Sequence, residues 1–244
     1  MSSVNVKTAI VTGGTGALGK FVVEKFCAEG YKVYIPVTSL KKFMQVFDSS
    51  LDENSEFTLR KIYAFECDAL DEESVNEFVE KVSGLEKGRI DVLVNTIGGI
   101  HPSVNTADIE STEFSKWFNL NFITALHFSK SVLKKMIPNG KGRIVSVGAM
   151  AGLEPAPGRL AYSVSKSALI VLMNTISKEY KRDGIRANTV IPSVIDTPAN
   201  REWGSAEEIK NWVSPEEVAG VIFELAENRL NAVRESVIKV FGNY

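Results

Sequence analysis

The sequence has few residues of the kinds that build metal sites and disulfide frameworks. Its 244 residues include only two cysteines and two histidines. Cys27 and Cys67 stand alone, without the CxxC spacing of zinc or redox motifs, so we expect neither a bound metal nor a disulfide. Isolated thiols of this kind suit a reducing compartment, and we therefore expect a cytoplasmic protein.

The chain also lacks a charge excess and a long apolar run. Its 28 basic and 30 acidic residues give a formal net charge of -2. A nearly neutral chain of this kind is not expected to bind nucleic acid or an anionic membrane surface. No run approaches the ~18 apolar residues of a membrane span. Met1, Ser2, Ser3 and Asn5 lead directly into an apolar strand, so we expect no signal peptide.

Strand-like and helix-like segments alternate along the whole chain. Apolar, β-rich runs occupy residues 6–11, 32–37, 62–65, 90–94, 142–147, 185–190 and 237–241. Helical spacing of apolar residues follows at 18–29, 72–82, 114–136, 160–181 and from Pro215 onward. This order predicts an α/β fold: a single doubly wound domain over residues 1–244, with helices on both faces of a mainly parallel seven-stranded sheet.

One stretch interrupts the alternation. Residues 193–214 are polar, contain Pro198, Trp203 and Gly204, and follow the expected carboxyl end of a strand. Ligands of open α/β sheets bind at that edge, so we interpret the stretch as a substrate lid. A plain surface insertion is the alternative, although long loops in compact domains are usually functional.

A glycine-rich loop joins the first strand to the first helix. Gly14-Thr15-Gly16-Ala17-Leu18-Gly19 has G-x-G-x-x-G spacing, and Gly13 precedes it. Spacing alone is weak evidence, but a strand directly before and a helix directly after are the context of a dinucleotide fingerprint. The glycines let a pyrophosphate approach the backbone, and the helix N-terminus favours its negative charge. This context predicts a Rossmann-type site for NAD(H) or NADP(H).

The end of the second strand bears on which of the two cofactors binds. An acidic residue about 20 positions after the glycines favours NAD(H) by binding the ribose hydroxyls. This sequence has Thr38 and Ser39 there instead, followed by Lys41 and Lys42. Hydroxyls and lysines suit a 2′-phosphate, which favours NADP(H). The alternative is that the two lysines only begin a solvated helix.

Tyr162 and Lys166 lie one helical turn apart, on the same face of a predicted helix. A free tyrosine has a pKa of about 10, and a nearby ammonium is expected to lower that pKa. Such a pair can pass a proton to a substrate atom while a hydride moves elsewhere. In isolation the spacing would equally describe an amphipathic surface pair.

Taken in order, these motifs resemble the short-chain dehydrogenase/reductase family over nearly the whole chain. The matching segments are Thr12-Gly13 with the glycine loop, Cys67-Asp68-Ala69, residues 91–98, Asn119-Leu120-Asn121, Tyr162 with Lys166, and Ile191-Pro192-Ser193 followed by Asp196-Thr197-Pro198. Six matches in the family's order are far more specific than any one of them.

The resemblance implies a role for each matching residue. The implied catalytic residues are Tyr162, Lys166 and Asn121, the last holding a water in the proton relay. The implied cofactor contacts are Gly13, Thr15, Gly16, Ala17, Leu18 and Gly19 at the pyrophosphate; Asp68 and Ala69 at the adenine; Asn95, which supports the central strand, with Thr96 and Ile97 beside the cofactor; Tyr162 and Lys166 at the nicotinamide ribose; and Pro192, Val194, Ile195 and Thr197 near the carboxamide. Thr38 and Ser39, assigned above from their own chemistry, complete the set at the adenosine ribose. Two of these have local alternatives: Asn121 could serve the backbone of its helix, and Asp68 could cap the next helix.

The sequence departs from the family at one catalytic position. The family carries a serine thirteen residues before the tyrosine, and here that position is Ala149. Alanine cannot donate a hydrogen bond to a substrate carbonyl. Loss of such a donor typically lowers the rate by ~10²–10³. Ser146 and Ser163 are the neighbouring hydroxyls that could substitute.

Within the family, the sequence most resembles the dihydropteridine reductase branch. That branch shares the form of the glycine loop, a glycine pair such as Gly98-Gly99, alanine at the serine position, and a lid like residues 196–201 followed by a tryptophan such as Trp212. Its substrate, a quinonoid dihydropterin, is an activated conjugated ring that needs less polarisation than a ketone. Val37 departs from the branch, where an acidic residue accompanies NADH.

Three functions remain open at this point. The leading hypothesis is an NAD(P)H-dependent reductase of a quinonoid dihydropterin or a similar conjugated small molecule. The second is an NADPH-dependent ketoreductase of 3-oxoacyl or other carbonyl substrates that uses a replacement donor. The third is a catalytically silent dinucleotide sensor or scaffold.

The two long predicted helices bear on assembly. Residues 114–136 and 160–181 carry apolar side chains on more than one face, which suits a helix-pair interface between copies. Together with the family resemblance this favours a homodimer or homotetramer. Burial of the same faces against the chain's own sheet is the alternative.

Overall fold

The computed structural model describes residues 6–47 and 61–242, so Met1, Ser2, Ser3 and Asn5 lie outside it. Its strands are β1 (Thr8–Thr12), β2 (Lys32–Val37), β3 (Ile62–Glu66), β4 (Val92–Asn95), β5 (Gly142–Val147), β6 (Ile185–Pro192) and β7 (Val237–Val240). They form one sheet in the order β3-β2-β1-β4-β5-β6-β7, and every neighbouring pair is parallel. The expected seven-stranded, doubly wound sheet is therefore confirmed, and it is parallel throughout.

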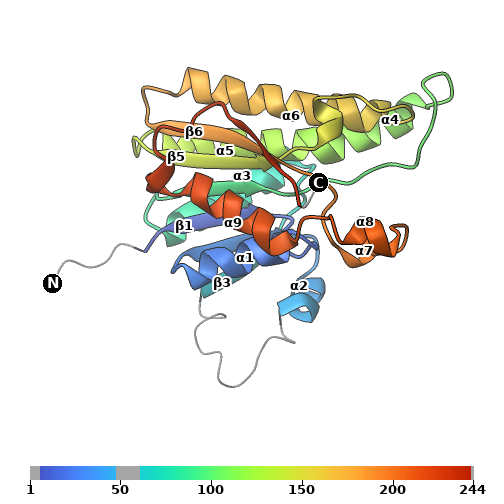
Figure 1. Ribbon diagram of the computed structural model, residues 1–244. Coiled ribbons are helices and arrows are strands. Elements are labelled where there is room, and N and C mark those ends of the chain that lie inside the picture. The colour runs from blue at the N-terminus through green and yellow to red at the C-terminus, as the bar shows by residue number, and fades with distance from the viewer. Residues whose placement is uncertain (1–5, 48–60, 243–244) are drawn as a thin grey trace.

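Helices cover both faces of this sheet. The longer ones are α1 (Gly19–Ala28), α3 (Glu72–Leu85), α5 (Thr124–Met136), α6 (Leu160–Glu179) and α9 (Pro215–Ala226). Figure 1 shows α1 and α9 on one side of the sheet and α5 and α6 on the other. Two hydrophobic clusters fill the spaces between sheet and helices, one with α1 and α9 and one with α3, α5 and α6.

The alternation of side chains along β1 explains why helices must cover both faces of the sheet. Ala9 and Val11 pack into the cluster beneath α1 and α9, whereas Ile10 packs into the cluster beneath α3 and α5. All three are completely buried. A strand that is apolar on both faces is stable only when helices cover both, which is why these runs are continuously apolar in the sequence.

The expected helix at residues 114–136 exists, but it is not a regular α-helix throughout. It consists of α4 (Ser111–Phe118), a π-helical segment (η3, Asn119–Ile123) and α5. The Thr124 N–H donates to the carbonyl of Asn119, five residues back instead of four. Such π segments are frequent at functional sites, and this one contains Asn121.

Three shorter helices lie at the sheet edge where the strands end. These are α2 (Leu40–Phe47), directly after β2, and α7 (Pro198–Arg201) and α8 (Ala206–Ile209) within residues 193–214. Ser205 and Ser214 begin α8 and α9 with capping boxes. The segment expected to be a lid therefore has local structure of its own.

Among the described helices, α6 is long and apolar enough to cross a membrane by length and mean composition, although polar residues such as Ser165 and Lys166 interrupt its apolar sequence. Half of its apolar window is buried inside the fold. It packs along β6, and its Lys166 is only 5% exposed. Its apolar composition therefore reflects its place as a core helix of the sheet.

Candidate active site

A cavity of about 730 Å³ lies at the carboxyl ends of the strands. It spans the point between β1 and β4 where the strand order reverses, the usual ligand position in open α/β sheets. The residues that line it are Gly13, Gly16, Ala17, Leu18, Gly19, Thr96, Gly98, Gly99, Ile100, Val147, Gly148, Ala149, Met150, Ala151, Tyr162, Lys166, Pro192, Ser193, Val194, Ile195, Thr197, Asn200, Trp203 and Phe241. Twelve residues predicted from the sequence are thus brought together.

The glycine loop gives this cavity a wall of bare backbone. Gly13 has a φ of +65°, and a Cβ there would lie 2.8 Å from the Thr96 hydroxyl oxygen. A Cβ on Gly19 would lie 2.1 Å from the Gly13 carbonyl oxygen, so only glycine lets α1 begin this close to the turn. The Gly16 N–H closes the turn by donating to the Gly13 carbonyl at 2.8 Å. Small residues and a helix N-terminus fit the pyrophosphate of a dinucleotide.

Thr96 holds the two central strand ends together. Its hydroxyl donates to the Thr12 carbonyl at 2.6 Å, and its N–H donates to the Thr12 hydroxyl at 3.2 Å. Asn95, one residue earlier, is buried and its side-chain amide donates to the Ser146 hydroxyl at 3.1 Å. This contact joins β4 to β5.

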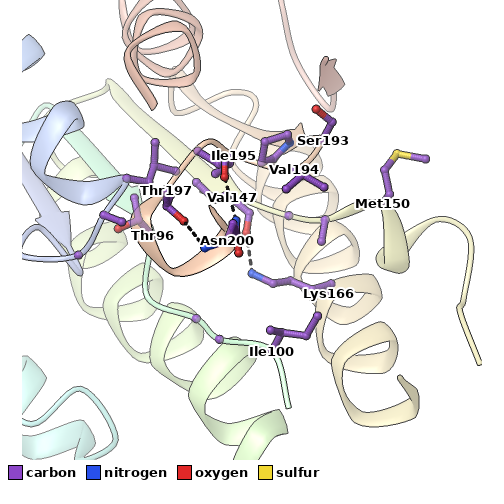
Figure 2. Close-up of a pocket in the computed structure, with 18 of the residues that line it drawn as sticks. Thr96, Ile100, Val147, Met150, Lys166, Ser193, Val194, Ile195, Thr197 and Asn200 are labelled. Carbon is purple, nitrogen blue, oxygen red and sulfur yellow. Dashed lines mark hydrogen bonds between the residues drawn. The ribbon is translucent and has the colours of Figure 1, made fainter. Parts of the chain in front are cut away.

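Tyr162 and Lys166 both reach the cavity from α6. Lys166 Nζ donates to the Val147 carbonyl at 2.9 Å (Figure 2). It lies 5.8 Å from the centroid of the Tyr162 ring. The Tyr162 hydroxyl has no hydrogen-bond partner among the described residues. The pair is therefore part of the site and not of the surface, and the tyrosine hydroxyl is free to meet a substrate atom.

Burial controls the protonation of both groups. It lowers the pKa of Lys166 to about 8. It also raises the pKa of Tyr162, with Arg159 opposing it only in part. The expected lowering of the tyrosine pKa by Lys166 is therefore wrong for this arrangement, because desolvation of the phenolate outweighs the opposing charge of Arg159. A tyrosine that keeps its proton near neutral pH is suited to donate it, as a reduction requires.

Asn121 lies behind the cavity and is completely buried. Its side-chain oxygen accepts from the Gly99 N–H at 2.9 Å, and its NH₂ donates to the carbonyls of Gly99 and Trp117 at 3.0 and 2.9 Å. The Asn121 side chain thus fixes the Gly98-Gly99 turn after β4. A Cβ on Gly98 would lie 3.1 Å from Lys166 Nζ, so this turn also sets the space around the lysine.

The position of the missing serine faces the cavity. Ala149 lines it in an extended conformation after β5. Ser146 is buried in the core, where its hydroxyl contacts Asn95 and lies 3.1 Å from the Met173 sulfur. Ser163 lines a separate hollow on the outer side of α6. Neither of the two serines named as substitutes lines the cavity, whereas Ser193, which sequence reasoning did not single out as a donor, does.

Seven residues predicted to contact the cofactor lie outside the cavity, among them all four that were predicted for the adenosine end. Thr15, Thr38, Ser39, Asp68, Ala69, Asn95 and Ile97 are not among its lining residues, although all follow or end strands at the same sheet edge. Ser39 accepts from the Lys42 N–H at 3.4 Å and so caps α2, with Lys41 and Lys42 exposed in its first turn. Asp71, and not Asp68, caps α3, so the capping role considered for Asp68 is wrong.

Residues 193–214 form one side of the cavity through Ser193, Val194, Ile195, Thr197, Asn200 and Trp203. Thr197 caps α7 by accepting from the Asn200 N–H, and the Asn200 side chain donates to the Ile195 carbonyl at 2.8 Å. Trp203 is 62% exposed and contacts Trp212 with ring centroids 5.1 Å apart. The segment is therefore a structured wall, anchored at Trp212, with an exposed tip.

Comparison with known protein families identifies the family to which this chain belongs. A family model described as short chain dehydrogenase matches residues 7–208. The chain belongs to the short-chain dehydrogenase family. As a member, it is an oxidoreductase with a nicotinamide dinucleotide as its cofactor, and the bare-backbone wall of the glycine loop fits that group.

Individual short-chain dehydrogenases resemble this chain over nearly all of both lengths. The 3-oxoacyl-[acyl-carrier-protein] reductase FabG of Thermotoga maritima is 30% identical, with 97% of this chain and 96% of the relative covered. The 7alpha-hydroxysteroid dehydrogenase of Clostridium sardiniense is 29% identical, with 100% and 95% covered. The solved structure of ElxO with NADP bound is 27% identical with a TM-score of 0.87, covering 96% of this chain and 97% of that one.

Proposed function

We propose that this short-chain dehydrogenase is a reductase of a conjugated, polar ring, with quinonoid dihydropterin as the leading substrate and NADPH as the preferred reductant. The observation that carries the proposal is Ala149: the cavity has Tyr162 and Lys166 but no hydroxyl at the position that polarises a ketone. A substrate that is already activated by conjugation does not need that second donor. The glycine pair Gly98-Gly99 and the lid residues 196–201 support the same branch of the family.

In this proposal the chain supplies a proton and a cavity with a mainly apolar lining, while a bound nicotinamide would supply the hydride. Tyr162 donates its hydroxyl proton to the reduced ring. Lys166, held at the Val147 carbonyl, would bind the nicotinamide ribose and would return a proton to Tyr162 after the transfer. Asn121 fixes the Gly98-Gly99 turn and holds a water in the proton relay. Residues 193–214 act as a lid on a single dinucleotide-binding and catalytic domain.

Restoring the missing hydroxyl tests the substrate class. Ala149→Ser should leave kcat/KM for quinonoid dihydropterin within about threefold of wild type, because that substrate does not depend on a second donor. If the natural substrate is a simple carbonyl, the same change should raise kcat/KM for acetoacetyl-coenzyme A by ~10²–10³, the usual contribution of such a donor. NADPH consumption measured with both substrates separates the two. Ala151→Ser, also at the cavity but two residues further on, is the matched control.

The ketoreductase is the second candidate because one observation favours it. The FabG reductase of Thermotoga maritima is 30% identical over nearly the whole chain, whereas the resemblance to dihydropteridine reductases depends on a few motifs. A large gain from Ala149→Ser, together with no turnover of dihydropterin by the wild-type protein, would favour this candidate over the first.

The preference for NADPH depends on the end of β2. Thr38 is exposed there, Ser39 caps α2, and α2 has no acidic residue in its first turn. A 2′-phosphate at this point would meet Lys41 and Lys42 and no carboxylate of that turn. We expect Kd for NADPH to be ~10–100-fold below Kd for NADH, the usual strength of one charge-assisted hydrogen bond. Fluorescence titration measures both constants, and tighter binding of NADH would contradict the assignment.

A double substitution refines this test. Lys41→Ala with Lys42→Ala should remove most of the preference for NADPH and leave Kd for NADH unchanged, so that NADH serves as the internal control. An equal weakening of both cofactors would indicate damage to α2 instead of loss of a phosphate contact.

We also propose a homo-oligomer, either a dimer or a tetramer, assembled through α4 and α6. Helix α4 has no buried residue, and Phe114, Phe118 and Phe122 contact one another along it and η3, with ring centroids 6.0 and 5.1 Å apart. On α6, Val171 is 62% exposed and Val164 39% exposed. Half-buried phenylalanines on α4 and η3, together with exposed valines on α6, suit a second copy of the chain. The free thiols of Cys27 and Cys67 support a cytoplasmic location.

A further inference from the structure

Some polar side chains that line the cavity are hydrogen-bonded within the protein, and others are not. Four are committed to the fold: Thr96 to the Thr12 carbonyl, Lys166 to the Val147 carbonyl, Thr197 to the Asn200 N–H, and Asn200 to the Ile195 carbonyl. Two hydroxyls have no partner among the described residues, those of Tyr162 and Ser193. The proposed function uses the first and leaves the second without a role.

Ser193 is fixed in place by its backbone and free at its side chain. It follows β6 directly, and its N–H donates to the Val240 carbonyl at 2.9 Å. Its hydroxyl oxygen is buried and unpartnered. Figure 2 shows Ser193 beside Val194, across the pocket from Ile100, with the hydroxyl turned away from Lys166. Because a serine side chain has three staggered positions, rotation about one bond redirects the hydroxyl without moving the strand.

The side chains next to Ser193 on the cavity wall offer no polar group that could replace its hydroxyl. Met150, Val194 and Phe241 are apolar. A buried hydroxyl without a partner is unfavourable, and an apolar wall gives it no alternative within the protein. A polar atom brought in by a ligand would satisfy it, and the same bond would fix how that ligand is turned in an otherwise smooth pocket.

We propose that Ser193 is a substrate-binding residue, which hydrogen-bonds a second polar ring atom of the substrate, distinct from the atom that Tyr162 protonates. The inference rests on the proposed function and narrows its substrate class. The ring must carry a nitrogen, carbonyl or amino group besides its reducible bond, as the pyrimidine half of a pterin does. Two hydroxyls acting on two atoms would hold such a ring in one orientation toward the nicotinamide.

Steady-state kinetics of three variants with quinonoid dihydropterin and NADPH test the inference. Ser193→Ala should raise KM for the dihydropterin by ~10-fold, the usual effect of losing one hydrogen bond, while kcat and KM for NADPH stay within about twofold. Ser193→Thr keeps the hydroxyl and should restore most of the affinity. Ser163→Ala removes another buried, unpartnered hydroxyl that lies outside the cavity, and should change none of these constants.

The outcomes separate this inference from the function on which it rests. An unchanged KM in Ser193→Ala, with an active wild-type protein, would overturn the role of Ser193 and leave the proposed function intact. A fall in kcat without a change in KM would also overturn it, because the hydroxyl would then be acting on the reacting atom. Absence of dihydropterin turnover in the wild-type protein would overturn both.

Discussion

Replacing Tyr162 by Phe should lower kcat by about 10²–10⁴, the usual contribution of a positioned general acid. The hydroxyl that is lost lines the cavity and is not paired with any described residue, so its removal breaks no hydrogen bond of the fold. Burial raises the pKa of Tyr162, which keeps the proton available for transfer. Ala149 stands where the family has a second hydrogen-bond donor, so the side chain at that position cannot replace the lost tyrosine hydroxyl. Initial rates of NADPH oxidation measure the effect.

Cofactor binding distinguishes loss of the proton from damage to the site. Because Lys166 is held by the Val147 carbonyl and not by Tyr162, Tyr162→Phe should lose at most the tyrosine's own contact to the nicotinamide ribose, and Kd for NADPH should stay within about tenfold of the wild-type value. Tyr180→Phe, just past the end of the same helix and outside the cavity, should leave kcat unchanged. A Tyr162→Phe protein that retains half of its kcat would show that the proton comes from elsewhere.

Replacing Gly19 by Ala should raise Kd for NADPH on the order of 100-fold and lower the free energy of unfolding by about 1–3 kcal/mol. The added Cβ would lie 2.1 Å from the Gly13 carbonyl oxygen and 2.9 Å from the Gly14 Cα. Neither backbone atom can move without displacing α1 from the turn that forms the cavity wall. Titration with NADPH and thermal unfolding measure the two effects.

Gly84→Ala is the matched control for that change. Gly84 lies in α3, and nothing lies within 4 Å of the Cβ that alanine would add. Alanine is the better helix former, so this variant should be as stable as the wild type or more stable, with an unchanged Kd. Equal behaviour of the two variants would show that the close approach at Gly19 has no role in binding.

The sheet and much of the site could be predicted because their signals are local. Continuous apolar runs such as 90–94 predict buried parallel strands, and a glycine cluster between a strand and a helix predicts the turn that Gly13 and Gly19 form. The i, i+4 spacing of Tyr162 and Lys166 places both on one face of α6. For these features, neighbouring residues in the sequence carry the whole argument.

Other features depend on contacts between distant segments. The π-helical segment at Asn121 lies where the Asn121 amide meets the Gly98-Gly99 turn, and the apolar periodicity of the sequence does not predict it. The raised pKa of Tyr162 is a consequence of burial, which the motif does not encode. Ser193 follows a strand like many loop serines, and only the packing around it reveals a hydroxyl without a partner. Helix α2 is the exception, because Leu40, Phe43, Met44 and Phe47 have the i, i+3, i+4, i+7 spacing of a helix and give it a local signal.

The central claim is that Tyr162 acts without a second donor, on a substrate that conjugation has already activated. Its most direct test compares kcat/KM of the wild-type protein for quinonoid dihydropterin and for acetoacetyl-coenzyme A, each with NADPH in saturating amounts. We expect the dihydropterin to be preferred by at least about 100-fold, since a ketone lacks the polarising hydroxyl at Ala149. Equal or faster reduction of the ketone, or no oxidation of NADPH or NADH with the dihydropterin, would contradict the account.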